Sequence, residues 1–174
     1  MQKIELMAPA GNFESLQAAL DNGCDSVYFG VEQLNMRARA SINFTLDDLE
    51  EISRRCSEKN VRTYLTLNTI IYDHDLSIVK TLIKRAKAAN ITAVIAMDQA
   101  VIAMARAEEM EVHISTQINI TNIETVKFYA MFADTVVLSR ELSLRQVKKI
   151  TEQIEKEEIK GPSGRLLEIE IFGH

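Results

Sequence analysis

Short apolar runs and amphipathic stretches alternate along the whole chain. Within each amphipathic stretch the apolar residues recur every three or four positions, as on a helix that buries one face. Predicted helices begin near residues 12, 45, 75, 98, 121 and 143. The apolar runs are typical of strands and cover residues 4–7, 26–29, 61–68, 93–97, 112–116, 135–138 and 167–172. The pattern therefore predicts seven strands and six helices in strict alternation.

Several predicted helices begin or end at a residue that favours a helix terminus. Asn12 is expected to cap the first helix, and Gly23 is expected to end it. Three further helix starts have the spacing of a capping box: Thr45–Asp48, Thr121–Glu124 and Ser143–Gln146. These signals place the helix boundaries independently of the hydrophobic pattern.

The last predicted helix and the segment after it are highly charged. We expect Leu144, Val147, Ile150 and Ile154 to form the buried face of this helix. Residues 156–165 contain two glycines and a proline among charged side chains, which predicts a flexible loop.

Short continuous apolar strands between helices indicate a parallel sheet covered by helices. With right-handed crossovers, such a chain forms either an open doubly wound sheet or a closed barrel. The turn Ala8–Gly11 lacks the G-x-G-x-x-G fingerprint that a dinucleotide-binding sheet carries after its first strand. We therefore expect an α/β fold of the TIM-barrel-like (β/α)n type, with parallel strands.

Polar residues recur at the carboxyl ends of the predicted strands. A barrel gathers these ends into one mouth, where active sites lie. The residues in these positions are Asn12, Asn35, Asn68, Asp98, Gln117, Arg140, Glu141 and His174.

The number of strands is one short of a barrel. A full barrel has eight units and typically ~250 residues, whereas this chain of 174 residues ends on its seventh predicted strand. We expect a single shortened barrel domain over residues 1–174, with the eighth unit missing. Its open edge would expose unpaired strands. The sequence therefore predicts a homo-oligomer through this edge, or pairing with the missing C-terminal part of a longer parent chain.

Composition narrows the class of protein. The formal charge of -5 argues against nucleic-acid binding through bulk charge, although it leaves room for a local basic patch. No apolar run is long enough to span a membrane, and no apolar signal segment precedes Glu5. Cys24 and Cys56 have no metal-type spacing. We expect a cytoplasmic protein without membrane contact, with two reduced and mostly buried thiols.

Three arginines are the most interesting charges at the predicted mouth. Arg37 and Arg39 lie on the long polar connection after the second strand, and Arg140 follows the sixth. In a barrel they can converge and hold a small anionic substrate, such as a dicarboxylate or a phosphate, by bidentate contacts. The alternative is that they are solvated or pair with Glu32 and Glu141.

Asn12, Asn68 and Gln117 are neutral hydrogen-bonding groups at strand ends. They can orient carbonyl or hydroxyl groups of a substrate in a concave site. The turn before Asn12 also points backbone donors outward, which predicts a seat for an anion or a substrate oxygen. Helix capping is the alternative role for Asn12.

The residues give little support for a known catalytic constellation. His74, His113 and His174 have no partners at metal-ligand spacing, so no metal site is expected. Ser115 with His113, or Ser139 with His174, can be imagined as a nucleophile and its base. The chain has neither a G-x-S-x-G elbow nor an H-E-x-x-H helix. The catalytic residues therefore stay unassigned.

Several segments, in order along nearly the whole chain, resemble peptidase family U-32, the collagenase-like peptidases of unassigned catalytic type. No single motif is specific, but their combination is. The matching segments are Glu5–Asn12, Asp25–Gly30, Asn35–Ala40, Asn43–Phe44, Leu67–Thr69, His113–Gln117, Val137–Ser143 and Glu168–His174.

This resemblance implies two kinds of activity. The family carries a peptidase or collagenase label, yet several members are associated with hydroxylation of tRNA, ribosomal RNA or ubiquinone precursors. Those members bind an iron–sulfur cluster through four cysteines, and some use prephenate. The cysteine-rich signature of the family begins just after the segment that matches Phe172–His174. The resemblance therefore implies no cofactor in this chain, and an iron–sulfur cluster in a full-length parent.

Three functions remain open from the sequence. The chain is the N-terminal barrel of a U-32 peptidase without full activity of its own, or part of an iron–sulfur-dependent protein that hydroxylates tRNA, ribosomal RNA or a ubiquinone precursor. The third is a non-catalytic module for anion binding or assembly. RNA is expected as a partner only of the full-length parent. The predicted substrate-binding residues are Asn12, Arg37, Arg39, Asn68, Gln117, Arg140, Glu141 and His174.

Overall fold

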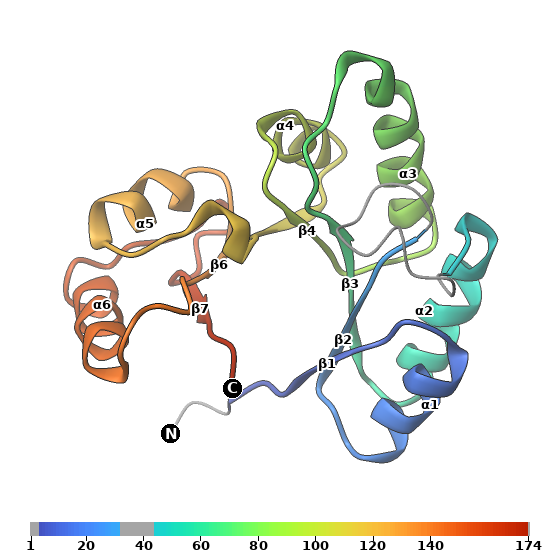
Figure 1. The fold of residues 1–174 in the computed structure, drawn as a ribbon, viewed down its shortest axis with the longest axis horizontal. Coiled ribbons are helices and arrows are strands. Elements are labelled where there is room, and N and C mark those ends of the chain that lie inside the picture. Colours follow the sequence, from blue (N-terminus) through green and yellow to red (C-terminus); the bar gives the residue numbers. More distant parts are fainter. Residues whose placement is uncertain (1–3, 32–43, 174) are drawn as a thin grey trace. The chain divides into compact units, whose positions relative to one another are not determined.

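The computed structural model describes residues 4–31 and 44–173 (Figure 1). Over these residues, seven strands and six α-helices alternate along the chain, as predicted. The chain divides into two compact units, unit 1 (Met1–Met110) and unit 2 (Glu111–His174). Each unit is a parallel sheet with helices as its strand connections.

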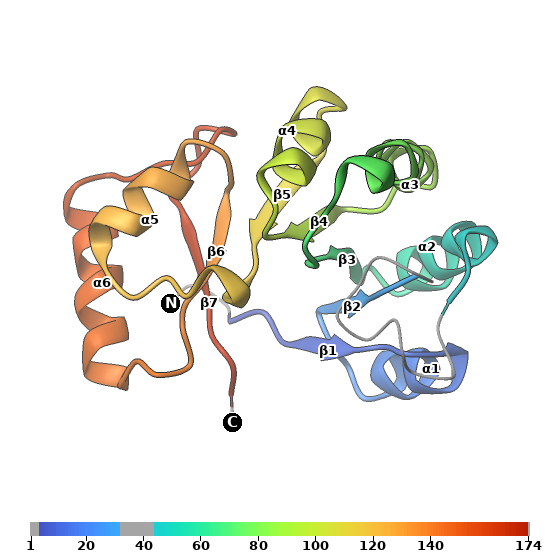
Figure 2. The same cartoon turned by 45° about the horizontal axis from the view of Figure 1, so that its top comes forward.

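Unit 1 contains four strands and four α-helices. The strands pair in parallel and in chain order, from β1 to β4. Figure 2 shows that the four helices lie on one side of these strands. A doubly wound sheet carries helices on both faces, so cover on one side is that of a barrel wall. The elements are β1 (Met7–Pro9), α1 (Phe13–Asp21), β2 (Ser26–Phe29), α2 (Leu49–Glu58), β3 (Arg62–Leu67), α3 (Leu76–Ala88), β4 (Ala93–Ala96) and α4 (Gln99–Ala107).

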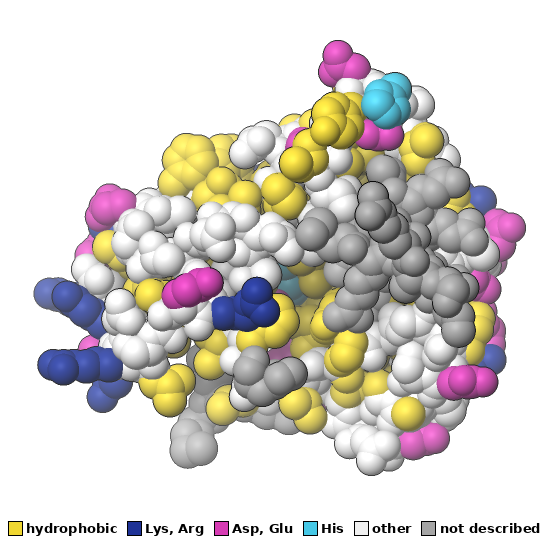
Figure 3. Space-filling view, in the orientation of Figure 1, with side chains coloured by type: hydrophobic (Ala, Val, Ile, Leu, Met, Phe, Trp, Pro, Cys, Tyr) yellow, Lys and Arg dark blue, Asp and Glu magenta, His cyan; other side chains and the backbone are white. Residues whose placement is uncertain are grey.

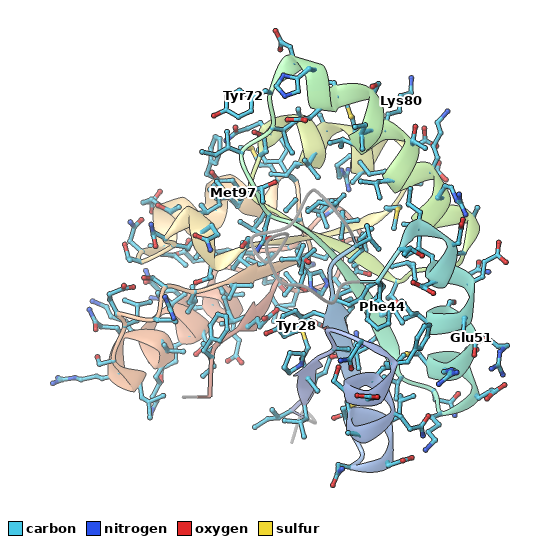
Figure 4. All side chains as sticks on the ribbon, turned by 45° about the vertical axis from the view of Figure 1, so that its right-hand side comes forward. Tyr28, Phe44, Glu51, Tyr72, Lys80 and Met97 are labelled. Atoms are coloured by element: carbon cyan, nitrogen blue, oxygen red, sulfur yellow. The ribbon has the colours of Figure 1, made fainter. Side chains whose placement is uncertain are left out.

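The strand register sorts the side chains of unit 1 between the two faces of its sheet. Phe29 packs edge-on against Phe44, whose ring also meets Phe13 of α1. This face is therefore the helix-covered one. Figure 4 shows Phe44 on the helix side of β2 and Tyr28 on the other side. We call the face that the unit's own helices leave uncovered its inner face. In unit 1 the inner face carries Tyr64, Ala93 and Ile95, with Met7 and Tyr28 packed against them.

Unit 2 repeats the plan with three strands, β5 (Glu111–Ile114), β6 (Thr135–Val137) and β7 (Glu168–Glu170). They pair in parallel and in chain order. Its helices are α5 (Ile123–Ala130) and α6 (Leu144–Lys156), which lie on one side of the strands in Figure 1. Apolar side chains fill the helix-covered face: Val112, Ile114, Val126, Val136, Leu138, Ile150 and Ile154 are all buried.

The first strand begins later than predicted. It starts at Met7, and Ile4 and Leu6 are exposed. The backbone N–H of Leu6 donates to the Asp25 side chain (2.9 Å), so a carboxylate takes the place of a strand partner there.

Most of the predicted helix caps are confirmed. One cap is at a neighbouring residue, and one residue predicted to be buried on α6 is exposed. The capping boxes at Thr45–Asp48 and Ser143–Gln146 are present. Helix α5 is capped by Asn122 rather than Thr121, because the Asn122 carboxamide oxygen accepts from the Thr125 backbone N–H (3.0 Å). Leu144 is 77% exposed, since the buried face of α6 is formed by its later turns.

The connection after α6 is fixed by Asp134, contrary to the prediction of a flexible loop. The Asp134 carboxylate accepts from the backbone N–H (3.0 Å) and the hydroxyl (2.6 Å) of Ser163. Gly161 lies directly against Asp134, and a Cβ atom there would collide with its backbone and side chain. The glycine is therefore required by close approach, and it anchors the loop.

The fold is an incomplete α/β fold of the TIM-barrel-like type. Its parallel strands follow the sequence within each unit, and helices cover one face of each sheet. The carboxyl ends of the strands are where such a fold carries its functional residues.

Candidate functional site

Asn12 serves as the N-cap of α1. Its side-chain oxygen accepts from the Ser15 backbone N–H (2.8 Å). The Ser15 hydroxyl in turn accepts from the backbone N–H groups of Gly11 (2.9 Å) and Asn12 (3.1 Å). The structure thus shows the capping role of Asn12, and binding of an anion at this turn stays a prediction.

Two other predicted residues of unit 1 follow their strands directly. Asp98 caps α4 by accepting from the Ala100 backbone N–H (2.8 Å), and it also accepts from the N–H of Ile71 (3.3 Å). Asn68 lies immediately after β3 and is half-buried. Asn68 keeps its place as a substrate-binding candidate, whereas Asp98 has a structural role.

Unit 2 brings two of the predicted residues together after β6. Arg140 and Glu141 are both exposed. The Arg140 guanidinium lies over the ring of Phe172, 5.8 Å from its centroid. The Ser139 hydroxyl donates to Glu141, and this hydrogen bond lowers the pKa of the Glu141 carboxyl. An exposed cation and an ionised carboxylate therefore lie next to each other at this strand end.

The remaining predicted residues are less defined by the structure. Gln117 is exposed on a short 3-10 helix (Thr116–Ile118) after β5. Asn35, Arg37, Arg39 and His174 lie outside the described residues. The convergence of the three arginines over one mouth therefore stays a prediction.

A set of side chains that the sequence analysis did not assemble lies on the inner face of unit 2. The register pairs His113 with Thr135 and Thr135 with Glu168, so these three share one row. Glu170 lies one row nearer the carboxyl end of the sheet, and Glu111 one row nearer the amino end. We call Glu111, His113, Thr135, Glu168 and Glu170 the inner-face cluster.

Two residues of the cluster are buried, and its three glutamates are half-buried. His113 and Thr135 are 4% and 5% exposed. The Nε2 atom of His113 is 3.5 Å from Glu111 Oε1, to which Arg165 also donates (3.3 Å). Over the described residues, Thr135 Oγ1 and Glu170 Oε2 are buried without a hydrogen-bond partner. Such orphaned polar atoms are rare in native proteins and call for an explanation.

Burial raises the pKa of the Glu170 carboxyl, and the nearby His113 opposes this effect in part. A carboxyl with a raised pKa holds its proton to higher pH than an exposed glutamate. In that form it is a hydrogen-bond donor, whereas a carboxylate only accepts.

The sequence did contain a signal for this cluster. Glu168, Ile169 and Glu170 alternate within a strand that we predicted from its apolar character. Two acidic residues spaced two apart in a strand lie on the same face. Because His113 likewise alternates with apolar neighbours, the face that it occupies could only be assigned from the register.

The two serines that the sequence offered as nucleophiles make other hydrogen bonds in the structure. Ser115 follows β5 and is 2% exposed, and its hydroxyl accepts from the Gln117 backbone N–H (3.3 Å). The Ser139 hydroxyl donates a hydrogen bond to the Glu141 carboxylate. The pairing of Ser139 with His174 lies outside the described residues.

The chain does not fit an iron–sulfur cluster, which is held by four cysteine thiolates. It has two cysteines, and both are free and buried. Burial raises the pKa of the Cys56 thiol to about 11, which disfavours the thiolate form that binds iron. Within the part of the chain that the structure describes, no group of three His, Cys, Asp or Glu side chains is placed to hold a metal ion. None of the described helices is long and apolar enough to cross a membrane.

By its fold and by the polar residues at its strand ends, the chain is a (β/α) protein of the TIM-barrel type. The model of Peptidase family U32 matches residues 11–174, and the chain belongs to this family.

Relatives in the family carry different names. A protein of Porphyromonas gingivalis named Collagenase is 51% identical over 170 residues, which are 98% of this chain and 41% of the relative. The tRNA hydroxylation protein P1 of Bacillus subtilis is 31% identical over 99% of this chain and 39% of its own length. The 23S rRNA 5-hydroxycytidine C2501 synthase of Escherichia coli is 31% identical over 85% of this chain and 22% of its own length. The chain thus spans about two fifths, or less, of these relatives.

Solved structures support the fold. The structure of the U32 peptidase Mk0906 matches with a TM-score of 0.70 at 14% identity, over 86% of this chain and 65% of that one. Tryptophan synthase subunit alpha from Legionella pneumophila matches with a TM-score of 0.59 at 18% identity, over 98% of this chain and 73% of that one. At these identities the likeness concerns the fold alone.

Proposed function

We propose that the chain is the substrate-binding N-terminal part of a U32 peptidase of the collagenase type, which acts together with the rest of a longer parent protein. One observation carries this proposal. A relative named Collagenase is 51% identical over 98% of the chain, whereas the relatives named for RNA hydroxylation are 31–32% identical. The proposed activity is hydrolysis of peptide bonds, so the parent would be a hydrolase.

The strand ends suit substrate binding more than nucleophilic attack. The Arg140 guanidinium lies over the Phe172 ring, and Glu141 adds a charge of opposite sign beside it. These groups can hold a carboxylate and polar groups of a peptide. We expect the rest of the parent to complete the catalytic site.

The test compares the full-length parent with residues 1–174 on fluorescent gelatin and on a short collagen-like peptide. The parent is expected to cleave both substrates, and residues 1–174 to bind the peptide without cleaving it. Arg140→Ala in the parent should weaken peptide binding, while Lys80→Ala on the exposed side of α3 (Figure 4) should leave it unchanged. A folded, full-length parent that cleaves neither substrate would overturn the proposal.

RNA hydroxylation is the second candidate, because relatives named for it match 85–100% of the chain. Figure 3 shows Lys and Arg side chains gathered over α6. Arg145, Lys148 and Lys149 are exposed there and spaced three and four residues apart, so they can contact phosphates. The free, buried cysteines suit a reducing compartment, which supports a cytoplasmic location. Cysteines elsewhere in the parent would hold the iron–sulfur cluster.

RNA hydroxylation by the parent can be tested separately from peptide cleavage. The anaerobically purified parent should contain iron and sulfide, and deletion of its gene should remove a hydroxylated nucleoside from tRNA or ribosomal RNA. A double variant, Lys148→Ala with Lys149→Ala, should weaken RNA binding several-fold at low salt. An iron-free parent and an unchanged nucleoside profile would end this candidate.

A further inference from the structure

The inner-face cluster of unit 2 is separate from the strand-end residues discussed so far. Glu170 is the last residue of β7, so it lies toward the carboxyl end of the sheet, where (β/α) barrels carry their active sites. Thr135 lies on β6, one row nearer the amino end, between His113 and Glu168. Hydrogen-bonding side chains from all three strands of the unit thus share one face.

Two observations mark this face as a site rather than a set of charges. Thr135 is 5% exposed, and its hydroxyl has no hydrogen-bond partner among the described residues. Glu170 Oε2 is likewise buried and without a partner there. Buried polar atoms are nearly always paired in native proteins, and exceptions occur where a ligand or a reacting group supplies the partner.

Burial, rather than the surrounding charges, favours the neutral form of Glu170. From β5 this face carries His113 and Glu111, the second of which binds Arg165. From β6 it carries only the uncharged Thr135 and Val137, and β7 itself adds Glu168. Burial raises the pKa of Glu170, while His113 acts in the opposite direction with a smaller effect. The carboxyl is therefore suited to hold a proton and to donate it in a hydrogen bond.

We propose that Glu170 and Thr135, beside His113, form a binding site for the amide group of a peptide, with the carboxylic acid of Glu170 donating to the amide carbonyl oxygen. This deepens the proposed peptidase function, on which it rests for the substrate class. A donor fixed at the carbonyl oxygen stabilises the negative charge that develops there when a nucleophile adds to the carbonyl carbon. The Thr135 hydroxyl accepts from the amide N–H.

The first test uses residues 1–174 with N-acetylglycinamide as the probe and acetate as its charged counterpart. Carbon-13 NMR should show that Glu170 titrates at higher pH than the other glutamates. The amide should shift the resonances of Thr135 and Glu170, and its binding should weaken roughly tenfold once Glu170 ionises, which is the loss of about one hydrogen bond. Binding that does not change across the Glu170 titration would overturn the proposal.

Variants separate donation by Glu170 from general effects on the fold. Glu170→Gln keeps a donor without a titrating proton, so the amide should still bind, now independently of pH. Glu170→Ala and Thr135→Val should each weaken amide binding roughly tenfold. Glu152→Gln, at an exposed residue of α6 outside the cluster, is the control and should leave binding unchanged. Equal losses in Glu152→Gln and Glu170→Ala would contradict the assignment.

The parent protein distinguishes failure of this site from failure of the peptidase function. A parent that cleaves peptides should lose most of its kcat in Glu170→Ala, and should keep its kcat in Glu152→Gln. Full cleavage by Glu170→Ala would overturn the site while the peptidase function stands. Amide binding with the expected pH dependence, in a parent that cleaves no peptide, would support the site and overturn the peptidase function.

Discussion

The inner faces of the two units have the same backbone plan and opposite contents. In unit 1 this face is packed with Tyr64 and Ile95, and Met7 and Tyr28 lie against them. In unit 2 the corresponding face carries carboxylates, an imidazole and a hydroxyl, two of which hold buried atoms without a partner among the described residues. Parallel strands covered by helices on one side thus support either a packed surface or a chemical one.

Some polar side chains of unit 1 are paired, although Ser26 Oγ is also buried there without a hydrogen-bond partner among the described residues. Glu5 pairs with Arg62 at the amino end of β3, and the Tyr64 hydroxyl donates to Glu5 (2.7 Å). In a (β/α) barrel, residues at this end serve stability, and those at the other end serve function. An apolar cluster thus lies on the inner face of unit 1, and a cluster of hydrogen-bonding side chains on that of unit 2.

The largest effect is expected from the packed face. Tyr64→Ala removes a side chain that is 1% exposed and should lower the free energy of unfolding by about 3–5 kcal/mol. Urea denaturation measures this change. Tyr72→Ala, at a residue that is 61% exposed, is the control and should change it by less than about 0.5 kcal/mol. Equal losses in the two variants would show that the inner face of unit 1 is not its core.

In unit 2, stability should depend on the contact between Asp134 and the connection after α6 rather than on the inner face. Gly161→Ala places a methyl group against Asp134, which should cost about 1–3 kcal/mol because the loop has to move. Thermal unfolding measures the loss, and Gly164→Ala is not a suitable control because Gly164 has a positive φ of 78°. Ser163→Ala, which removes one hydrogen bond to Asp134, should cost less. A stable Gly161→Ala variant would contradict the close approach.

The inner face of unit 2 should instead reduce stability as the pH rises. The pKa of Glu170 is raised in the folded chain, so its contribution is fully present below the unfolded value near 4.5 and is lost as the pH passes the folded value. Glu170→Gln removes this penalty and should stabilise the chain by about 1 kcal/mol at neutral pH. Denaturation at several pH values measures this difference. The difference should vanish at pH values well below 4.5, and a constant gain at all pH values would contradict this explanation.

The smallest effect is expected at the ion pair of unit 1. Glu5→Gln keeps an acceptor for the Tyr64 hydroxyl and removes the charge that pairs with Arg62. Because the Arg62 side chain is 42% exposed, the loss should stay below about 1 kcal/mol and decrease with added salt. Urea denaturation at low and high salt measures it. A large loss that is insensitive to salt would show that the pair belongs to the core.

Much of the fold could be predicted because its signals are local. Apolar runs and helical spacing gave the seven strands and six helices, and Gly23 ends α1 with a positive φ of 78°. The predictions of a helix cap and of a buried residue were wrong where neighbouring residues could both take the same position. Thr121 and Asn122 can both cap α5, and Leu144 follows the helical spacing but precedes the turns that touch the sheet.

The candidate site could be predicted only in part, because it depends on contacts between distant strands. The strand ends carry Asn68, Arg140 and Glu141 as expected. The inner-face cluster needs the register of β5, β6 and β7, which decides whether His113 faces the helices or the opposite side. Alternation within one strand does not contain that information.

The most direct measurement of the contrast between the two units is a map of amide binding over both inner faces. N-acetylglycinamide is titrated into residues 1–174, and chemical shifts are followed for Tyr28 and Tyr64 in unit 1 and for Thr135 and Glu170 in unit 2. We expect chemical-shift changes at Thr135 and Glu170 and none at the two tyrosines. Shifts concentrated at Tyr28 and Tyr64 would contradict it, because the packed face would then be the one that binds.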